Sequence, residues 1–300
     1  MKYEAVISNM LMHVSSRLEK LSTNRGASFD GDNRTGINDV TIRRHRFPVY
    51  AVSMFAFALG MPAWGDEEPN EISECDVFIE INATDEDAGW QGILDASPWR
   101  MAQVIGPDEN GSDGKTFLKI KAQGEARKQG ITEYRWESAE PTFDDFALED
   151  FLDRFPAGEY TCSVTFIDGH PKKEEDEDEL THCLPDGPVI TDPGELPAGT
   201  DWTVMWGPVT TQYDGDGPGL GAPLDECDPE DELVKYNVTV EFENGFDKVM
   251  NFDVMAPASM AVISGDFLEC GLEGKVEIGA FLDSGNSTFR EIEIATSDCP

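Results

Sequence analysis

Apolar and polar side chains alternate along short stretches of this 300-residue chain, most regularly between residues 201 and 296. Such alternation predicts β-strands with one buried face, because successive side chains of a strand point to opposite sides of the sheet. The clearest strands are expected at residues 201–210, 236–242, 274–281 and 291–294. Turn residues such as Asn244-Gly245 lie between them. Short strands divided by turns predict a β-sandwich over residues 201–297.

A second series of alternating stretches predicts another β-sandwich over residues 75–188. Its strands are expected at residues 76–83, 90–94, 99–105, 116–120, 131–137, 160–166 and 180–184. The charged residues 170–179 are expected to form the loop between the last two of these strands. A Pro-rich linker is expected at residues 189–200. The predicted fold class is therefore all-β, with two tandem β-sandwich domains.

Residues 143–155 have a different pattern from their surroundings. Phe146, Leu148, Phe151 and Leu152 have helical spacing, with acidic residues early and Arg154 late, as the helix dipole favours. One short helix is predicted there.

The first 74 residues have the features of an export signal followed by a leader. Residues 40–65 run from a basic segment through a short apolar segment to small residues, which predicts a signal peptide cleaved before Asp66. The apolar segment is too short for a membrane span. Residues 1–39 are interpreted as a non-native extension ahead of a start at Val40, or as an amphipathic arm around residues 7–21. An acidic leader is expected at residues 66–74.

The segment after the predicted cleavage site is strongly acidic. It has 14 Lys and Arg against 55 Asp and Glu, a formal charge of −41. Such a charge disfavours nucleic acid and anionic membranes as partners. Divalent cations and basic partners suit it better, and a solvated acidic surface is the simplest interpretation.

All six cysteines follow the predicted cleavage site, and none belongs to a Cys-x-x-Cys pair. They are Cys75, Cys162, Cys183, Cys227, Cys270 and Cys299. An even number confined to an exported segment predicts disulfides. The expected location is therefore periplasmic or extracellular.

The C-terminal region, residues 186–297, resembles a fibronectin type III domain. The resemblance rests on Trp206-Gly207-Pro208-Val209 and on Tyr236, and it implies that Trp206 packs beneath Tyr236 in the core. An insertion at residues 211–232 separates the two aromatic residues more widely than the family does. The family's Tyr at the start of the sixth strand is absent from residues 270–274, where Cys270 is a candidate replacement for the corner contact.

The preceding region resembles immunoglobulin-like sandwiches. Tyr160 stands two residues before Cys162, which is the tyrosine-corner arrangement of that group. The resemblance implies that Tyr160 belongs to the core of the first domain. Tandem sandwiches of this type are similar to those of exported bacterial proteins.

The expected strand order gives one prediction of the disulfide pairing. Cys162 and Cys183 are expected to face each other across one hairpin, and Cys270 and Cys299 to lie at the same end of the second domain. Cys75 and Cys227 are paired by elimination, in a bond that would tie the domains together. Each bond is expected to contribute about 2–4 kcal/mol.

Residues suited to catalysis are scarce in the segment after the predicted cleavage site. It has two histidines, His170 and His182, and neither a nucleophile elbow nor a Gly-rich phosphate loop. Carboxylates are so frequent that no acid pair stands out. We expect a non-enzymatic protein.

Asp-rich turns provide candidate calcium ligands, because calcium takes six to eight oxygen ligands. The insertion has the best set, and the alternative is a tolerated surface insertion held by Cys227. Its candidate ligands are Asp214, Asp216, Asp225, Asp228 and Glu230. Two other turns qualify, Asp85-Glu86-Asp87 and the one with Asp108, Asn110 and Asp113.

The predicted function is a monomeric binding or spacer module of the cell envelope, with an unidentified protein or glycan bound through sandwich loops. This hypothesis expects exposed aromatic residues, with Trp90, Trp99 and Tyr213 as candidates. A calcium-stiffened structural module is the alternative, and a hydrolase with a cleft and a perturbed acid pair is a further one. No cofactor other than calcium is expected. The Asn-x-Ser/Thr sequences at Asn82, Asn237 and Asn286 are interpreted as coincidence.

Overall fold

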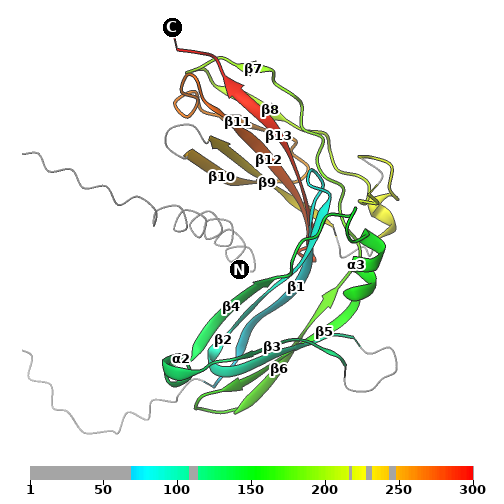
Figure 1. Ribbon diagram of the computed structural model, residues 1–300, viewed down its shortest axis with the longest axis vertical. Helices are drawn as coiled ribbons and strands as arrows, with labels where there is room; N and C mark the ends of the chain where they lie inside the picture. The colour runs from blue at the N-terminus through cyan, green and yellow to red at the C-terminus, as the bar shows by residue number, and fades with distance from the viewer. Residues whose placement is uncertain (1–68, 108–113, 216–217, 228–231, 243–247, 300) are drawn as a thin grey trace, which may run out of the picture. The chain divides into compact units, whose positions relative to one another are not determined.

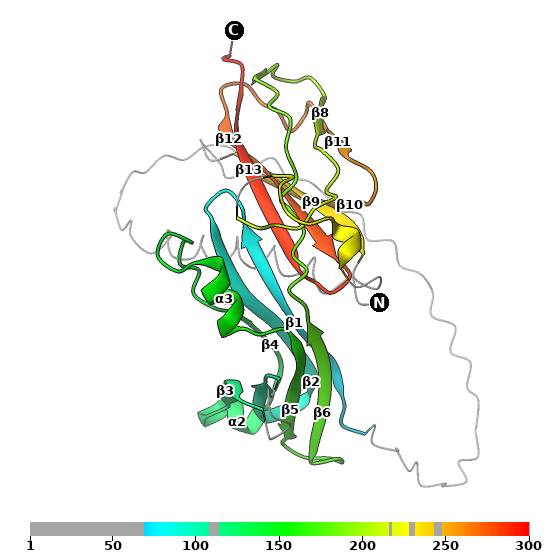
Figure 2. The same ribbon diagram turned by 90° about the vertical axis from the view of Figure 1, so that its right-hand side faces the viewer.

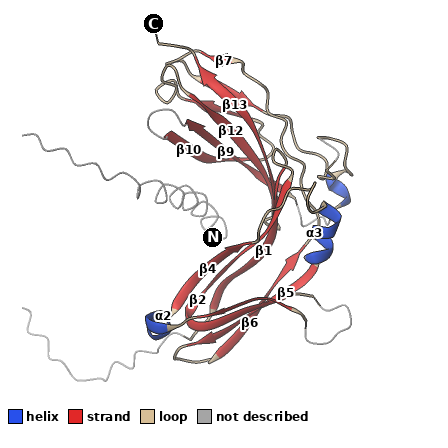
Figure 3. Cartoon of the chain, viewed as in Figure 1, coloured by secondary structure: helices blue, strands red, loops and turns tan. Residues whose placement is uncertain are grey.

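In the computed structural model, residues 69–107, 114–215, 218–227, 232–242 and 248–299 are described. They form an all-β, β-sandwich-like structure with two short α-helices and one 3-10 helix (Figures 1 and 3). The elements are β1 (Ile72–Asn82), β2 (Asp87–Ile105), β3 (Thr116–Lys121), α2 (Gly124–Gln129), β4 (Ile131–Glu137), α3 (Leu148–Arg154), β5 (Gly158–Phe166), β6 (Lys173–Leu180), β7 (Glu195–Leu196), β8 (Trp202–Met205), η1 (Leu224–Glu226), β9 (Leu233–Phe242), β10 (Lys248–Met255), β11 (Met260–Ile263), β12 (Glu273–Leu282) and β13 (Ser287–Thr296).

Strands from both predicted sandwiches belong to one hydrogen-bonded sheet in the order β10-β9-β12-β13-β1-β2-β5-β6. The halves meet where β1 pairs in parallel with β13 over Glu80–Asn82 and Ser287–Phe289 (Figure 2). In addition β3 and β4 pair with β2, β7 pairs with β13, and β8 pairs with β11 in a small separate sheet.

The long strand β2 combines two predicted strands. Its first part pairs with β1 and β4, and its second part pairs with β3 and β5. Between them lies Ser97-Pro98, where the register with β4 shifts between Asp95 and Trp99. Because Pro98 has no N–H to donate to a neighbouring strand, the hydrogen-bond register is irregular at this point, although the strand continues.

Two hydrophobic cores lie along this sheet. The first includes Trp99, Tyr160 and Phe166, and the second includes Tyr236 and Phe242; all five side chains are fully buried. The alternation of β1 illustrates the origin of such cores, because its odd-numbered residues from Cys75 to Ile81 are buried and its even-numbered ones are less buried.

The expected return strand at residues 180–184 is wrong. Strand β6 instead covers Lys173–Leu180, most of which was expected to be a loop. This strand ends the sheet order, and an edge strand rich in charge is a common protection against aggregation. The helix is shorter than expected, and helix α2 and strands β10 and β11 were not expected. The Asn244-Gly245 turn, the signal peptide and the region 1–39 lie outside the described residues.

Both resemblances place their key tyrosines correctly. The rings of Trp206 and Tyr236 meet edge to face with centroids 5.3 Å apart, and the Val209 N–H donates to the Tyr236 hydroxyl at 3.1 Å. The Tyr160 hydroxyl donates to the Pro156 carbonyl at 3.1 Å, which is the hydrogen bond of a tyrosine corner.

The disulfides are Cys75–Cys162, Cys183–Cys227 and Cys270–Cys299. The third confirms the prediction, and the predicted pairs Cys162–Cys183 and Cys75–Cys227 are wrong. The β5–β6 register sets Cys162 opposite Asp176, so Cys183 lies beyond the end of the hairpin. Cys162 instead reaches Cys75 on β1. Three disulfides indicate an oxidising, extracytoplasmic environment. Among the described residues no helix is long and apolar enough to span a membrane.

Candidate functional site

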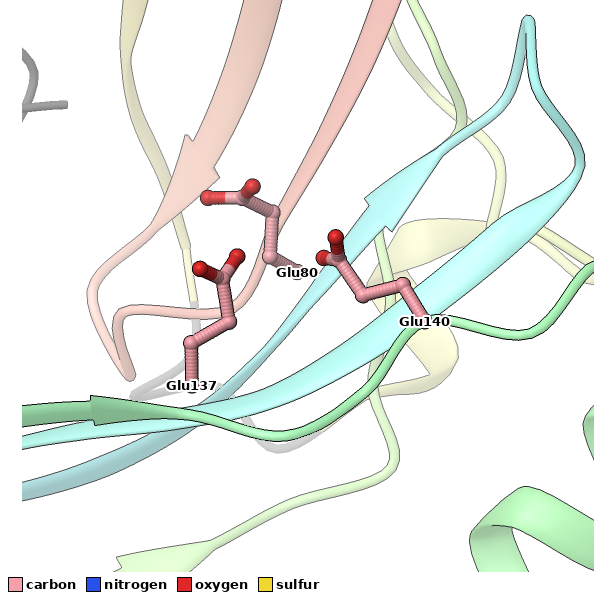
Figure 4. Close-up of side chains that lie close together, drawn as sticks. All are labelled: Glu80, Glu137 and Glu140. Atoms are coloured by element: carbon pink, nitrogen blue, oxygen red, sulfur yellow. The ribbon is translucent and has the colours of Figure 1, made fainter. Parts of the chain in front are cut away.

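Three glutamates converge where the two halves of the sheet meet. Glu80 lies on β1, Glu137 ends β4, and Glu140 follows three residues later. Figure 4 shows their carboxylates pointing toward a common space. One oxygen from each can be chosen so that all three lie within 4.8 Å of one another. No other group of three His, Cys, Asp or Glu side chains within the described ranges is this close.

The strand pairing explains why Glu80 and Glu140 meet. Ile79 and Ile81 are buried in the first core, so Glu80 points to the opposite face of β1. Its partner on β2 is Gly89. A Cβ atom on Gly89 would lie 2.6 Å from the Glu140 Oε1, so the missing side chain leaves the space that the Glu140 carboxylate occupies.

The third carboxylate, that of Glu137, is hydrogen-bonded by Gln91 of β2. Gln91 is the register partner of Glu137, and the Gln91 Nε2 donates to the Glu137 Oε1 at 3.1 Å. Gly89 and Gln91 of β2 therefore determine the positions of Glu140 and Glu137, which belong to the end of β4 and the segment after it.

Burial is the main reason that the pKa values of two of these glutamates are raised. For Glu80 the pKa rises to about 8, with the charges of Glu140, Glu137 and Glu277 adding to the effect of burial. For Glu140 the pKa rises to about 7, through burial and the charge of Glu137. Negative charge on this cluster is therefore costly near neutral pH.

The same face of the sheet continues the acidic surface onto β12. Burial raises the pKa of Glu277 to about 7, against a lowering by Lys275. Lys275 forms an ion pair with Glu291 of β13 at 2.6 Å. Lys275, which lowers the pKa of Glu277, is thus already engaged with another carboxylate.

A buried hydroxyl lies beside Glu80. Ser287 of β13 is the register partner of Glu80, and Ser287 also pairs with Phe281 of β12, whose face it shares. Its side chain is 0% exposed, and its Oγ has no hydrogen-bond partner. A buried hydroxyl without a partner is uncommon and calls for an explanation.

Asn286, the residue before Ser287, makes contacts between the two halves of the sheet. Its Oδ1 accepts from the Ile79 N–H at 2.8 Å, and its Nδ2 donates to the Cys183 carbonyl at 2.9 Å and to the Thr181 carbonyl at 3.0 Å. The side chain is 0% exposed. In the sequence Asn286 stands out only as part of an Asn-x-Ser/Thr sequence, and no local pattern indicates these contacts.

The insertion packs against the segment that precedes it. Tyr213 belongs to the first core, and its N–H donates to the Leu184 carbonyl at 2.8 Å. The Asp186 Oδ2 accepts a hydrogen bond from the Gly219 N–H at 2.5 Å. The Cys183–Cys227 disulfide links the same two segments covalently. The insertion is therefore held at several points.

The predicted calcium ligands of the insertion lie partly outside the described residues, namely Asp216, Asp228 and Glu230. Asp214 and Asp225 are described, but neither belongs to the close carboxylate group. In the second candidate turn, Asp85-Glu86-Asp87, the Asp85 Oδ2 accepts a hydrogen bond from the Asn82 Nδ2 at 3.0 Å. The turn with Asp108, Asn110 and Asp113 lies in the undescribed range 108–113.

The expectation of exposed aromatic residues is wrong for all three candidates. Trp90 is 5% exposed, Trp99 is 0% exposed and Tyr213 is 9% exposed, so each serves the first core. Trp90 stacks on Phe155 with ring centroids 5.1 Å apart. Large aromatic side chains gain the most from burial. A local sequence pattern cannot distinguish an aromatic residue of the core from one that binds a ligand.

A pocket of about 430 Å³ adjoins the carboxylate cluster. Glu140 lines it together with residues of and around α3, among them Phe151 and Arg154. The Arg154 guanidinium lies over the Phe146 ring, 4.1 Å from its centroid. Glu140 is thus shared between the cluster and the pocket.

No family model matches the chain, and no curated protein matches it. Among solved structures, the chain is similar to the crystal structure of chicken CNTN1 FN1-FN3 domains. The sequence identity is 11% and the TM-score is 0.35, and the match covers 77% of this chain and 69% of that chain.

Proposed function

We propose that this chain is an exported, non-enzymatic spacer in which two tandem β-sandwich domains are held in one fixed relation. The supporting observation is the contact around Asn286, whose buried side-chain amide in the second domain hydrogen-bonds Ile79, Thr181 and Cys183 of the first. A spacer needs such a joint, because domains connected by a linker alone move relative to each other.

Three further contacts support a stiff joint. The β1–β13 pairing carries backbone hydrogen bonds from one domain to the other, as in the bond from the Ala83 N–H to the Phe289 carbonyl at 2.8 Å. The Thr84 Oγ1 accepts from the Glu291 N–H at 2.9 Å. The Cys183–Cys227 bond joins the end of the first domain to the insertion of the second.

Small-angle X-ray scattering tests this proposal. Asn286→Ala removes the central amide. As a matched control, Asn251→Ala removes a β10 amide that donates hydrogen bonds to the Asn237 Oδ1 and the Thr239 Oγ1 of β9. We expect the wild-type and control chains to give the same scattering profile and Asn286→Ala to give a larger radius of gyration. Equal profiles for all three chains would count against a joint that depends on Asn286.

A protein-binding role is the second candidate, and an exposed apolar face supports it. Met205 and Met260 are register partners on β8 and β11, and they are 45% and 57% exposed. Val262 on the same small sheet is 63% exposed. Exposed methionines adapt to varied partners. A photo-crosslinker at position 260 should capture a partner that the same group at position 177 on β6 does not.

The non-enzymatic part of the proposal has its own test. A hydrolase would use the raised carboxylate pKa values and the pocket beside Glu140. We expect no turnover of ester, peptide or glycoside test substrates by the purified chain. Turnover that Glu140→Gln abolishes would overturn this part and leave the spacer proposal untouched.

A further inference from the structure

Positive charge in this acidic chain is concentrated at one edge of the sheet. The segment after the predicted cleavage site has 55 Asp and Glu against 14 Lys and Arg, but residues 114–129, which include β3 and α2, have five Lys and Arg against one Glu. Two exposed lysines of β3 and two exposed cations of α2 form the basic patch, which consists of Lys119, Lys121, Arg127 and Lys128.

The opposite edge of the same part of the sheet has the opposite charge. Strand β6 has six Asp and Glu against one Lys. The second part of β2 pairs with β3 on one side and with β5 on the other, and β6 pairs with β5, so β3 and β6 are the outer strands (Figure 2). Four exposed glutamates of β5 and β6 form the acidic strip, which consists of Glu159, Glu175, Glu177 and Glu179.

Both charged surfaces have residues on one face of these four strands. Ala102 and Val104 of β2 are buried in the first core, so the residues that alternate with them point to the opposite, outer face. One row of register partners on the outer face, taken from β3 to β6, consists of Lys119, Gln103, Ser163 and Glu175. The charge of the outer face therefore changes from positive to negative across the sheet.

The centre of the outer face is uncharged and partly apolar. Met101 and Ile105 of β2 alternate with the core residues, are half-buried, and belong to neither hydrophobic core. The other central residues are Gln103, Thr161, Ser163 and Thr165. Protein interfaces commonly have an uncharged, partly apolar centre with a polar rim, and the outer face has this arrangement.

Protection against strand pairing explains the acidic strip but not the basic patch. Charge of either sign discourages pairing at an edge, and acids far outnumber bases in this chain, so a second acidic edge would be expected. Within the described residues Lys128 forms an ion pair with Glu125 at 2.7 Å, but the other three cations of the basic patch have no carboxylate partner. They are therefore available to carboxylates of another molecule.

We propose that two copies of the chain associate through this outer face, with the basic patch of each copy against the acidic strip of the other. A two-fold axis parallel to the strands brings β3 of one copy opposite β6 of its partner twice, which closes the contact as a dimer. Unlike charges attract locally although each chain is strongly negative, because the Debye length is about 8 Å at physiological salt. Exposed ion pairs are individually weak, so the dimer is transient and depends on concentration.

The dimer goes beyond the spacer proposal and does not rest on it, because both charged surfaces belong to the first half of the sheet. Sedimentation equilibrium of the full chain over a range of concentrations tests it. We expect a monomer–dimer equilibrium at about 0.1 M salt that shifts to monomer at about 1 M, where the Debye length falls from about 10 Å to about 3 Å. Association that ignores the two surfaces should increase with salt instead, because screening relieves the repulsion between two acidic chains.

Charge reversal distinguishes the two surfaces from net charge. Lys119→Glu with Lys121→Glu makes both surfaces acidic, and Glu175→Lys with Glu177→Lys makes both basic. Each double variant alone should dimerise at least about tenfold more weakly than wild type, because like charges then meet in both contacts. An equimolar mixture of the two should form a heterodimer, because both contacts again join unlike charges.

Asp225→Lys with Glu226→Lys is the matched control, since it reverses two exposed charges on η1. We expect it to dimerise like wild type and, mixed with the Lys119→Glu, Lys121→Glu variant, to give no more dimer than wild type does. Circular dichroism checks that each variant is folded. A monomeric wild type at about 0.1 M salt, a mixture without heterodimer, or assemblies larger than two would each overturn the proposal. A monomeric wild type that binds heparin would assign the basic patch to an anionic polymer instead.

Discussion

The Asn286 Oδ1 accepts a hydrogen bond from the Ile79 N–H at 2.8 Å, across a separation of 207 residues. Ile79 is 0% exposed and belongs to the first core, whereas Asn286 lies in the turn between two strands of the second half. The Asn286 side chain therefore connects the first core to the turn between β12 and β13.

Asn286→Ala should lower the free energy of unfolding by about 2–4 kcal/mol, because it leaves the buried Ile79 N–H and the Cys183 carbonyl without their partner. Denaturant unfolding measures the loss. The partly exposed Asn82, whose side chain caps a surface turn, is a matched control, and Asn82→Ala should cost under about 1 kcal/mol. Similar losses at the two positions would contradict a special role for Asn286.

The Cys75–Cys162 bond should contribute about 4 kcal/mol to stability, because it closes a long loop between two buried residues. Replacement of both cysteines by alanine, followed by denaturant unfolding, measures this contribution. Peptide mapping of the non-reduced chain checks the connectivity. A peptide that links Cys162 to Cys183 would show that the pairing described here is incorrect.

The two structural tyrosines should differ when each loses its hydroxyl. Tyr236→Phe leaves the buried Val209 N–H without an acceptor and should cost about 1–3 kcal/mol. Tyr160→Phe removes a donor to the partly buried Pro156 carbonyl and should cost about 0.5–1.5 kcal/mol. Thermal unfolding of both variants gives the order, and a larger loss for Tyr160→Phe would contradict it.

Stability without divalent ions should fall as the pH rises from about 5 to about 8. The pKa of Glu277 is about 7 and that of Glu80 is about 8 in the folded chain, above the usual value of 4.5. Within this window the folded chain binds more protons than the unfolded chain, so the free energy of unfolding decreases with pH. The stabilisation is present at the acidic end and is lost as the pH passes the folded values.

Glu277→Gln provides the internal comparison for that pH dependence. Glutamine does not titrate, so the variant should show a shallower fall in melting temperature between pH 5 and pH 8 than wild type. Glu177→Gln on the exposed β6 strand should keep the wild-type slope. A wild-type stability that stays level or increases over this range would contradict the raised pKa values.

The sequence was most informative where a short motif coincides with a structural unit. Trp206 and Tyr236 meet as the fibronectin type III resemblance implied, and Tyr160 forms its corner hydrogen bond. Such positions are predictable because a local pattern fixes both the strand and its buried face. Cys270–Cys299 was predictable for a related reason, since its strands β12 and β13 are neighbours in the chain.

Features that depend on sheet order were not predictable. Cys75 and Cys162 are 87 residues apart, and Cys162 was assigned to a hairpin whose centre was misplaced. Glu137 and Glu140 reach Glu80 only because β4 pairs with β2, so that Gly89 and Gln91 lie next to them. In a chain with 60 acidic residues, nothing in the local sequence distinguishes these three glutamates from the others.

The proposed fixed relation of two tandem domains is tested most directly by residual dipolar couplings of backbone amides in a weakly aligned sample. Couplings from β1, β2 and β5 report on the first domain, and those from β9, β12 and β13 report on the second. The proposed spacer predicts that one alignment tensor fits both sets in the wild-type chain, and that Asn286→Ala requires two. Two tensors of different magnitude in the wild-type chain would contradict the proposal.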